Sequence, residues 1–185
     1  ASPPRTARHW PRRRHRSRFY STICANIARV GFSIGTGKIA GVDPREMGVS
    51  DLVVIWGTNP VNTQVNVMTH AVKARKERGA RIVAIDIYRN GTMQQADMAL
   101  CLRPGTDGAL ALGMLNVIIN EGLYDREFVD KWVHEFAELR ERVQQYPREK
   151  VAAITEVPAA EIAAAARLFA GAKQAAVHWG VPIDM

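Results

Sequence analysis

The fold is decided by residues 52–88, which read LVVIWGTNPVNTQVNVMTHAVKARKERGARIVAIDIY. Two short apolar runs rich in β-branched residues, 52–56 and 81–88, predict buried strands. Between them, apolar residues at helical spacing predict a helix over 61–78, with a cationic last turn and Gly79 as its C-cap. Strand, helix and strand in this order form a βαβ unit, which implies a parallel pair of strands.

The pattern continues on both sides of this unit. Asp43 as an N-cap, Pro44 at the first helical position and Glu46 three residues after the cap predict a helical turn over 44–49. Further strands are expected at 98–104 and 175–180, and further helices at 108–121, 127–146 and 158–172. The helix over 127–146 is expected to bury Phe128, Trp132, Phe136 and Leu139. We therefore predict an α/β fold, a Rossmann-like parallel sheet with flanking helices.

Composition indicates an ordinary globular chain of single-domain size. The sequence has 185 residues, of which 47% are hydrophobic and 23% charged, and this excludes disordered, collagen-like and coiled-coil classes. No apolar run approaches the roughly 18 residues that a membrane span needs, so we expect no span. Two cysteines 77 residues apart, in no CxxC pattern, favour a reducing cytoplasm over a disulfide scaffold.

The net charge of +7 belongs entirely to the first 18 residues. Residues 1–18 hold seven arginines and no acid, whereas the remaining chain holds 18 basic and 18 acidic residues. We expect this Arg/Pro-rich leader to be disordered, and residues 19–185 to form the α/β domain. A basic tail that binds RNA or an acidic partner, a solvated tail and a sequence-boundary artefact all remain open. No apolar segment of a signal peptide follows the arginines.

Polar residues follow each predicted strand at the edge where parallel sheets bind ligands. After the first strand, Gly57 lets the backbone approach a phosphate, while Thr58 and Asn59 supply a hydroxyl and an amide. Asn62 and Thr63 are expected in the first turn of the following helix, where they would add donors. The alternative is a plain strand-to-helix turn with a capping side chain.

The next two strand ends carry carboxylates. Asp86, with Ile85 before it, resembles the acidic residue that accepts hydrogen bonds from ribose hydroxyls, although it could equally be a solvated strand end. Asp107, which follows the flexible Gly105, could pair with the N–H edge of a guanine or merely cap its helix. Together the three segments predict a nucleotide site. The GxGxxG and GxxxxGK[ST] fingerprints are absent, which argues against a standard NAD domain or a P-loop NTPase.

An ordered set of motifs resembles the molybdopterin oxidoreductases, which include formate dehydrogenases, periplasmic nitrate reductases and dimethyl-sulfoxide reductases. The motifs are STICxxxxxxG, SDLVVIWGTNP, KERGARIVAIDIYRNGT, QADMALCLRPGTDGAL and, further on, GLYDREFV and ITEVPAAEIAAAARLFAGAKQAAVHWG. The resemblance runs from about Tyr20 to the end of the chain. It implies a partial domain of a larger molybdopterin oxidoreductase.

The resemblance assigns roles to particular residues. Cys24, seven residues before Gly31, matches the molybdenum ligand of the formate dehydrogenase and nitrate reductase branches, although a lone cysteine is more often a buried small residue. The turn over 57–60 matches the one that holds a phosphate of molybdopterin guanine dinucleotide. Asp86 matches the family residue that contacts the guanosine ribose. Gly105 and Asp107 match the loop that binds the guanine base. Where some relatives have Asp-Pro-Arg, this chain has Asp86-Ile87-Tyr88.

The resemblance also implies partners and limits. The cofactor would be molybdenum bis(molybdopterin guanine dinucleotide), and the 4Fe-4S cluster would lie in an N-terminal part that this sequence does not include. We expect a small-molecule substrate, the remainder of the catalytic subunit, electron-transfer subunits and no nucleic acid. The chain by itself is expected to be inactive. Two alternatives stay open, a non-catalytic guanine-nucleotide-binding remnant and a nucleic-acid binder acting through residues 1–18.

Overall fold

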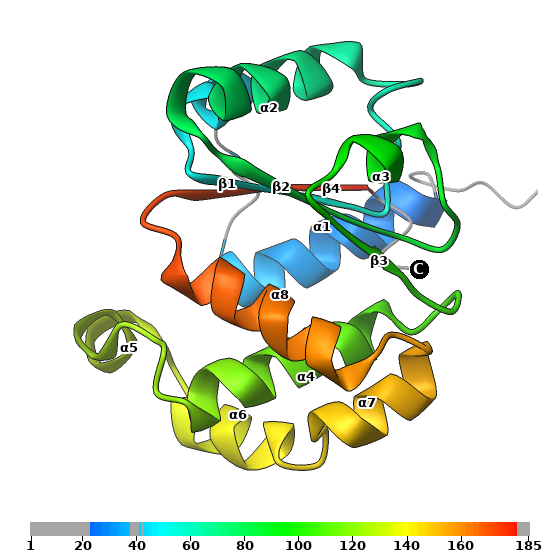
Figure 1. The fold of residues 1–185 in the computed structure, drawn as a ribbon. Coiled ribbons are helices and arrows are strands. Elements are labelled where there is room, and N and C mark those ends of the chain that lie inside the picture. The colour runs from blue at the N-terminus through cyan, green and yellow to red at the C-terminus, as the bar shows by residue number, and fades with distance from the viewer. Residues whose placement is uncertain (1–22, 38–40, 42, 181–185) are drawn as a thin grey trace, which may run out of the picture.

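The computed structural model describes residues 23–37, 41 and 43–180. The leader over residues 1–18, expected to be disordered, lies outside the described residues. Within them, four parallel strands form one sheet, and helices cover both of its faces (Figure 1). The predicted α/β class, a Rossmann-like parallel sheet with flanking helices, is confirmed.

The strands follow the order β3-β2-β1-β4 across the sheet. They are β1 (Leu52–Trp56), β2 (Arg81–Asp86), β3 (Met98–Cys101) and β4 (Ala175–Trp179). The helices are α1 (Ile23–Thr36), the 3-10 helix η2 (Pro44–Val49), α2 (Val65–Arg78), α3 (Gly91–Gln95), α4 (Asp107–Asn120), α5 (Arg126–Trp132), α6 (Phe136–Val143), α7 (Arg148–Thr155) and α8 (Ala159–Gly171). β1 occupies an inner position, with β2 on one side and β4 on the other.

Successive side chains of β1 point to opposite faces of the sheet. Because the residues of β1 are all apolar, the strand presents an apolar surface on both faces. Leu52 and Val54 pack with α4, α7 and α8, whereas Val53 and Ile55 pack with η2 and α2 (Figure 1). A strand covered on both faces reads as a continuous apolar run, which is why LVVIW lacks alternation. Full burial of each such side chain contributes about 1.5–3 kcal/mol to folding.

Two helix ends confirm the capping residues predicted for them. The Asp43 carboxylate accepts a hydrogen bond from the Arg45 backbone N–H at 2.9 Å and caps η2, while its ion pair with the Arg45 guanidinium lowers the pKa of Asp43 to about 2. Gly79 closes α2 in the left-handed conformation, with φ of 71°. This conformation is the usual requirement for glycine after a helix.

The predicted helix over 61–78 begins four residues later, at Val65. The backbone N–H groups of Asn62 and Thr63 both donate to the Asn59 carbonyl oxygen, at 3.0 and 3.1 Å, and the Thr63 hydroxyl donates to the same oxygen at 2.9 Å. These local bonds build a turn before the helix. The prediction that Asn62 and Thr63 lie in the first helical turn is therefore wrong.

The predicted helix over 127–146 is broken into α5 and α6. Between them Glu135 adopts a left-handed conformation with φ of 55°, which a continuous helix does not allow. Phe128 and Trp132 are 56% and 63% exposed, so the prediction that they face inward is wrong. The helices α1, α3 and α7 were not predicted.

No helix among the described residues is both long and apolar enough to span a bilayer.

Candidate functional site

A cleft of about 390 Å³ lies at the carboxyl ends of β1, β2 and β3. These strands are neighbours in the sheet, and the loops that follow them meet at the right-hand edge of the view in Figure 1. The lining residues are Gly57, Thr58, Asn59, Asp86, Ile87, Tyr88, Pro104, Gly105 and Asp107. Six of the residues predicted from the sequence therefore share one cleft.

The loop after β1 is held by backbone contacts on both sides. Gly57, in the left-handed conformation with φ of 64°, donates its N–H to the Ile85 carbonyl oxygen at 2.8 Å. On the other side, Gly180 donates to the Trp56 carbonyl oxygen at 2.7 Å. A Cβ atom at Gly180 would overlap the Gly57 carbonyl oxygen, so the two chain segments touch there.

Side chains of the loop bind neighbouring elements. The Thr58 hydroxyl donates to Oε1 of Gln64 at 2.9 Å, and the Thr92 hydroxyl donates to Oδ1 of Asn59 at 2.8 Å. With its Oδ1 occupied in this way, Asn59 keeps its amide nitrogen as a donor. The loop therefore combines a positive-φ glycine with fixed polar side chains, an arrangement suited to an anionic group.

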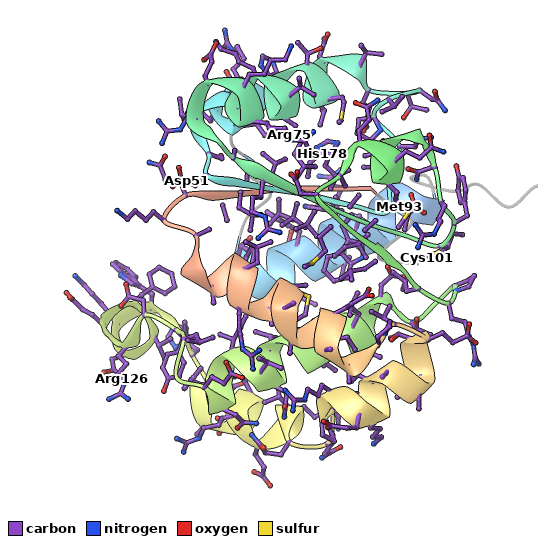
Figure 2. All side chains as sticks on the ribbon, viewed as in Figure 1. Asp51, Arg75, Met93, Cys101, Arg126 and His178 are labelled. Atoms are coloured by element: carbon purple, nitrogen blue, oxygen red, sulfur yellow. The ribbon has the colours of Figure 1, made fainter. Side chains whose placement is uncertain are left out.

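His178 on β4 joins the same hydrogen-bond network. Its Nε2 lies 2.8 Å from Oε1 of Gln64, on the side of the sheet that α2 covers (Figure 2). A carbonyl oxygen can only accept, so this contact requires a proton on Nε2. Burial lowers the pKa of His178 below its ordinary value of 6.5, and the neutral ring is favoured.

The Asp86 carboxylate is fixed by protein donors at the end of β2. Its Oδ1 accepts from the Ile87 backbone N–H at 2.7 Å, and its Oδ2 accepts from the Asn90 amide at 2.7 Å. The residue is only 9% exposed, which rules out the alternative of a solvated strand end. Each carboxylate oxygen can accept more than one hydrogen bond, so capacity remains for a hydroxyl group.

The Asp107 carboxylate is oriented by an aromatic side chain. The indole Nε1 of Trp56 donates to Asp107 Oδ1 at 2.7 Å, from the end of β1 to the first residue of α4. Thr106 occupies the N-cap position, and its hydroxyl donates to the Arg103 carbonyl oxygen. Asp107 is thus not the cap of its helix, contrary to the alternative considered above.

Of the four remaining predicted residues, Asn62, Thr63 and Ile85 do not line the cleft. Asn62 and Thr63 are exposed in the turn before α2. The Ile85 side chain is 1% exposed and packs in the core, so only its carbonyl oxygen contributes, by holding Gly57. Cys24 lies in α1, and its side chain is outside the described part of the structure.

The helix that carries Cys24 lies beside the cleft. Gly31 and Phe32 of α1 line an adjoining hollow of about 470 Å³, which Trp56 and Asp107 also line. The Phe32 ring stacks on Trp179 of β4, with ring centroids 6.0 Å apart. Asp107 therefore lines both hollows.

Trp56, Asn90 and Gly180 were missed as site residues. Trp56 carries the one polar side-chain atom in the run LVVIW, which is a signal in the sequence. Asn90 reads as an N-cap because its side chain accepts from the Thr92 and Met93 N–H groups, but its contact with Asp86 has no separate signal. Gly180 lies 123 residues from Gly57, so only the folded chain reveals their contact.

Comparison with known proteins gives a consistent result. A family model described as molybdopterin oxidoreductase matches residues 23–182. The probable oxidoreductase YoaE of Bacillus subtilis (strain 168) is 40% identical over 153 residues, which cover 83% of this chain and 22% of that protein. Formate dehydrogenase H of Escherichia coli (strain K12) is 38% identical over 158 residues, covering 85% of this chain and 22% of that protein.

A solved structure agrees with the described fold. Acetylene hydratase from Pelobacter acetylenicus superimposes with a TM-score of 0.75 and 38% sequence identity, over 88% of this chain and 22% of that one. The chain therefore spans about a fifth of the length of these relatives. The described domain corresponds to part of a larger molecule in each of them.

Proposed function

The chain belongs to the molybdopterin oxidoreductase family, and from this premise we propose that its cleft binds the guanine nucleotide end of molybdopterin guanine dinucleotide. The family implies a molybdenum–pterin cofactor. The observation that carries the finer proposal is the convergence of the loop over 57–59, Asp86 and Asp107 on one cleft. Each supplies the chemistry that one part of a nucleotide needs.

The donors and acceptors of the cleft fit such a group. Guanine presents N1–H and a 2-amino group as neighbouring donors, and a carboxylate such as that of Asp107 accepts from both. Asp86 has the capacity to accept a ribose hydroxyl. The turn over 57–59 would receive a phosphate through backbone N–H groups and polar side chains.

The phosphate site is smaller than the sequence suggests. Because α2 begins at Val65 and Asn62 and Thr63 lie outside the cleft, we assign no phosphate contact to the first turn of α2. The left-handed Gly57 and the adjoining Thr58 and Asn59 carry this part of the proposal.

We keep Cys24 as the proposed molybdenum ligand. Its helix borders the hollow that Trp56 and Asp107 also line, so α1 lies next to the cleft. A thiolate is a soft donor suited to this metal. When bound, the molybdenum–pterin group supplies two-electron redox chemistry. The bis form of the cofactor, a 4Fe-4S cluster, electron-transfer subunits and a cytoplasmic location belong to the same proposal.

The chain alone is proposed to bind without catalysing, since it matches about a fifth of each relative. For the whole protein, the oxidation of a small molecule is our first candidate. Hydration is the second, because the chain is also similar to acetylene hydratase, with 38% sequence identity to its solved structure. Assaying the loaded, full-length enzyme for dye reduction with formate and for hydration of acetylene separates the two.

Titration calorimetry of the purified chain with GDP tests the proposed site. In D107N, one oxygen remains for the Trp56 indole while an amide group faces the guanine donors, so GDP should bind roughly 5- to 150-fold more weakly. Xanthosine diphosphate, which has a carbonyl oxygen in place of the 2-amino group, should gain affinity for D107N. D130N, on the exposed surface of α5, is the matched control. Equal GDP affinity in D107N and the wild type would contradict the proposal.

A further inference from the structure

Trp56 is held in one orientation by its surroundings. Its ring packs against the core cluster formed by β1, β2, α4 and α8, and borders an apolar hollow of about 170 Å³ that Leu52, Met114 and Phe169 also line. Its backbone is fixed as well, because its carbonyl oxygen accepts the Gly180 N–H at 2.7 Å. The indole N–H therefore has a defined direction.

That direction determines the plane of the Asp107 carboxylate. Rotation about χ2 of an aspartate is broad, so an isolated carboxylate at a helix start samples many orientations. An indole N–H can only donate, and here it donates to Oδ1 at 2.7 Å, a distance typical of charge-assisted hydrogen bonds. With Oδ1 engaged, Oδ2 and the remaining lone pair of Oδ1 keep fixed directions for a ligand.

Recognition of two neighbouring donors depends on this plane. A carboxylate accepts from N1–H and the 2-amino group of guanine at once only when both oxygens lie in the plane of the base. A hypoxanthine base offers N1–H alone, so it demands less of the carboxylate orientation. Fixing the carboxylate therefore favours guanine over hypoxanthine.

We propose that Trp56 is a positioning residue that sets the base specificity of the cleft by orienting Asp107. This inference rests on the proposed function, because it assigns the carboxylate to a guanine base. Trp56 is also covalently next to Gly57, so one residue links the base end of the cleft to its phosphate end. If Trp56 acted only by packing against the core, replacing it would weaken the binding of all nucleotides equally. Base specificity would then not change.

The substitution Trp56→Phe tests the inference because it removes the N–H and keeps an aromatic ring. We expect the ratio of GDP to IDP affinity, measured by calorimetry, to fall by about 2- to 10-fold, the loss typical of one hydrogen bond. In a D107A background, which has no carboxylate to orient, W56F should leave the GDP to IDP ratio unchanged. W132F, at an exposed site on α5, should keep the wild-type ratio.

The possible outcomes separate the two proposals. If the wild-type chain does not bind GDP, the proposed function is overturned, and this inference with it. If GDP binds and W56F leaves the GDP to IDP ratio unchanged, only the role of Trp56 is overturned. Hydrogen exchange of the Trp56 indole N–H in ¹⁵N-labelled wild-type protein does not depend on the folding of W56F. GDP should slow this exchange, and an unchanged rate contradicts the inference.

Discussion

Asp86 and Asp107 line the same cleft, but different groups hold them. Asp86 accepts from a backbone N–H and an amide within four residues of it, so its geometry is local. Asp107 depends on Trp56, which lies 51 residues earlier in the chain. The sequence could indicate both carboxylates because they follow strands, but it carries no signal for a partner at such a separation. The orientation of Asp107 is therefore information that only the fold supplies.

At the residue scale, His178 should make stability depend on pH. Its neutral form is favoured in the folded chain because burial lowers its pKa, whereas the unfolded chain takes up a proton near 6.5. Stability should therefore be fully present above about pH 6.5 and decrease as the pH falls below it, toward the lowered pKa of the folded state. We expect H178Q to remove this component, measured as Tm from about pH 8 to about pH 5.

The control for this prediction is the exposed His134, between α5 and α6. H134Q should follow the wild-type dependence of Tm on pH. Tm of H178Q is compared with that of the wild type between pH 6.5 and the acidic range where carboxylates titrate. If Tm falls with pH equally in both proteins, His178 is not the group responsible.

At the scale of elements, periodicity predicted the strands well and the peripheral helices poorly. β1 and β2 are covered on both faces, so their apolar runs were unambiguous. The spacing of Phe128, Trp132, Phe136 and Leu139 is helical, but a helical pattern does not specify whether the helix continues or what it faces. Asp125 caps α5 through the Phe128 N–H, and Glu135 breaks the continuation. Local bonds determined these boundaries.

The contact between the end of β4 and the loop after β1 should be sensitive to a single methyl group. In G180A, the new Cβ would overlap the Gly57 carbonyl oxygen, and backbone cannot yield as a flexible side chain does. We expect a loss of about 1–3 kcal/mol in the free energy of unfolding, measured by urea denaturation, together with weaker GDP binding.

Gly171, the last residue of α8, provides the matched control. A Cβ at this position meets no atom within 4 Å, so G171A should keep wild-type stability and GDP affinity. Wild-type stability and GDP affinity in G180A would mean that the loop after β1 can move away from Gly180. That result would contradict the conclusion that contacts with Gly180 hold this loop in place.

At the scale of the whole molecule, the parallel sheet brings three distant loops to one edge. The predicted loops share one cleft because the carboxyl ends of neighbouring parallel strands lie at the same edge of a sheet. The strand order was not predicted, since it depends on which strands pair and not on any one segment. The net charge of +7 says little about the cleft, because residues 1–18 carry it and lie outside the described residues.

A second hollow offers the whole-molecule alternative to the proposed site. It has a volume of about 520 Å³ and runs along β4 and η2, with Asp43, Lys173 and His178 among its lining residues. It is larger than the cleft, but it does not include the loops that follow β1, β2 and β3. The larger volume favours the hollow along β4 and η2 as the nucleotide site. The convergence of polar groups at the strand ends favours the cleft.

Amide chemical-shift mapping of the ¹⁵N-labelled chain during a GDP titration distinguishes these locations most directly. We predict that the perturbed amides cluster at residues 57–59, 86–88 and 105–107, around the cleft that Asp86 and Asp107 line. The amides of α5 should remain unchanged. Perturbations confined to residues 43–50 and 173–179, or no perturbation at saturating GDP, would contradict the central claim that this chain binds guanine nucleotides at the carboxyl ends of its strands.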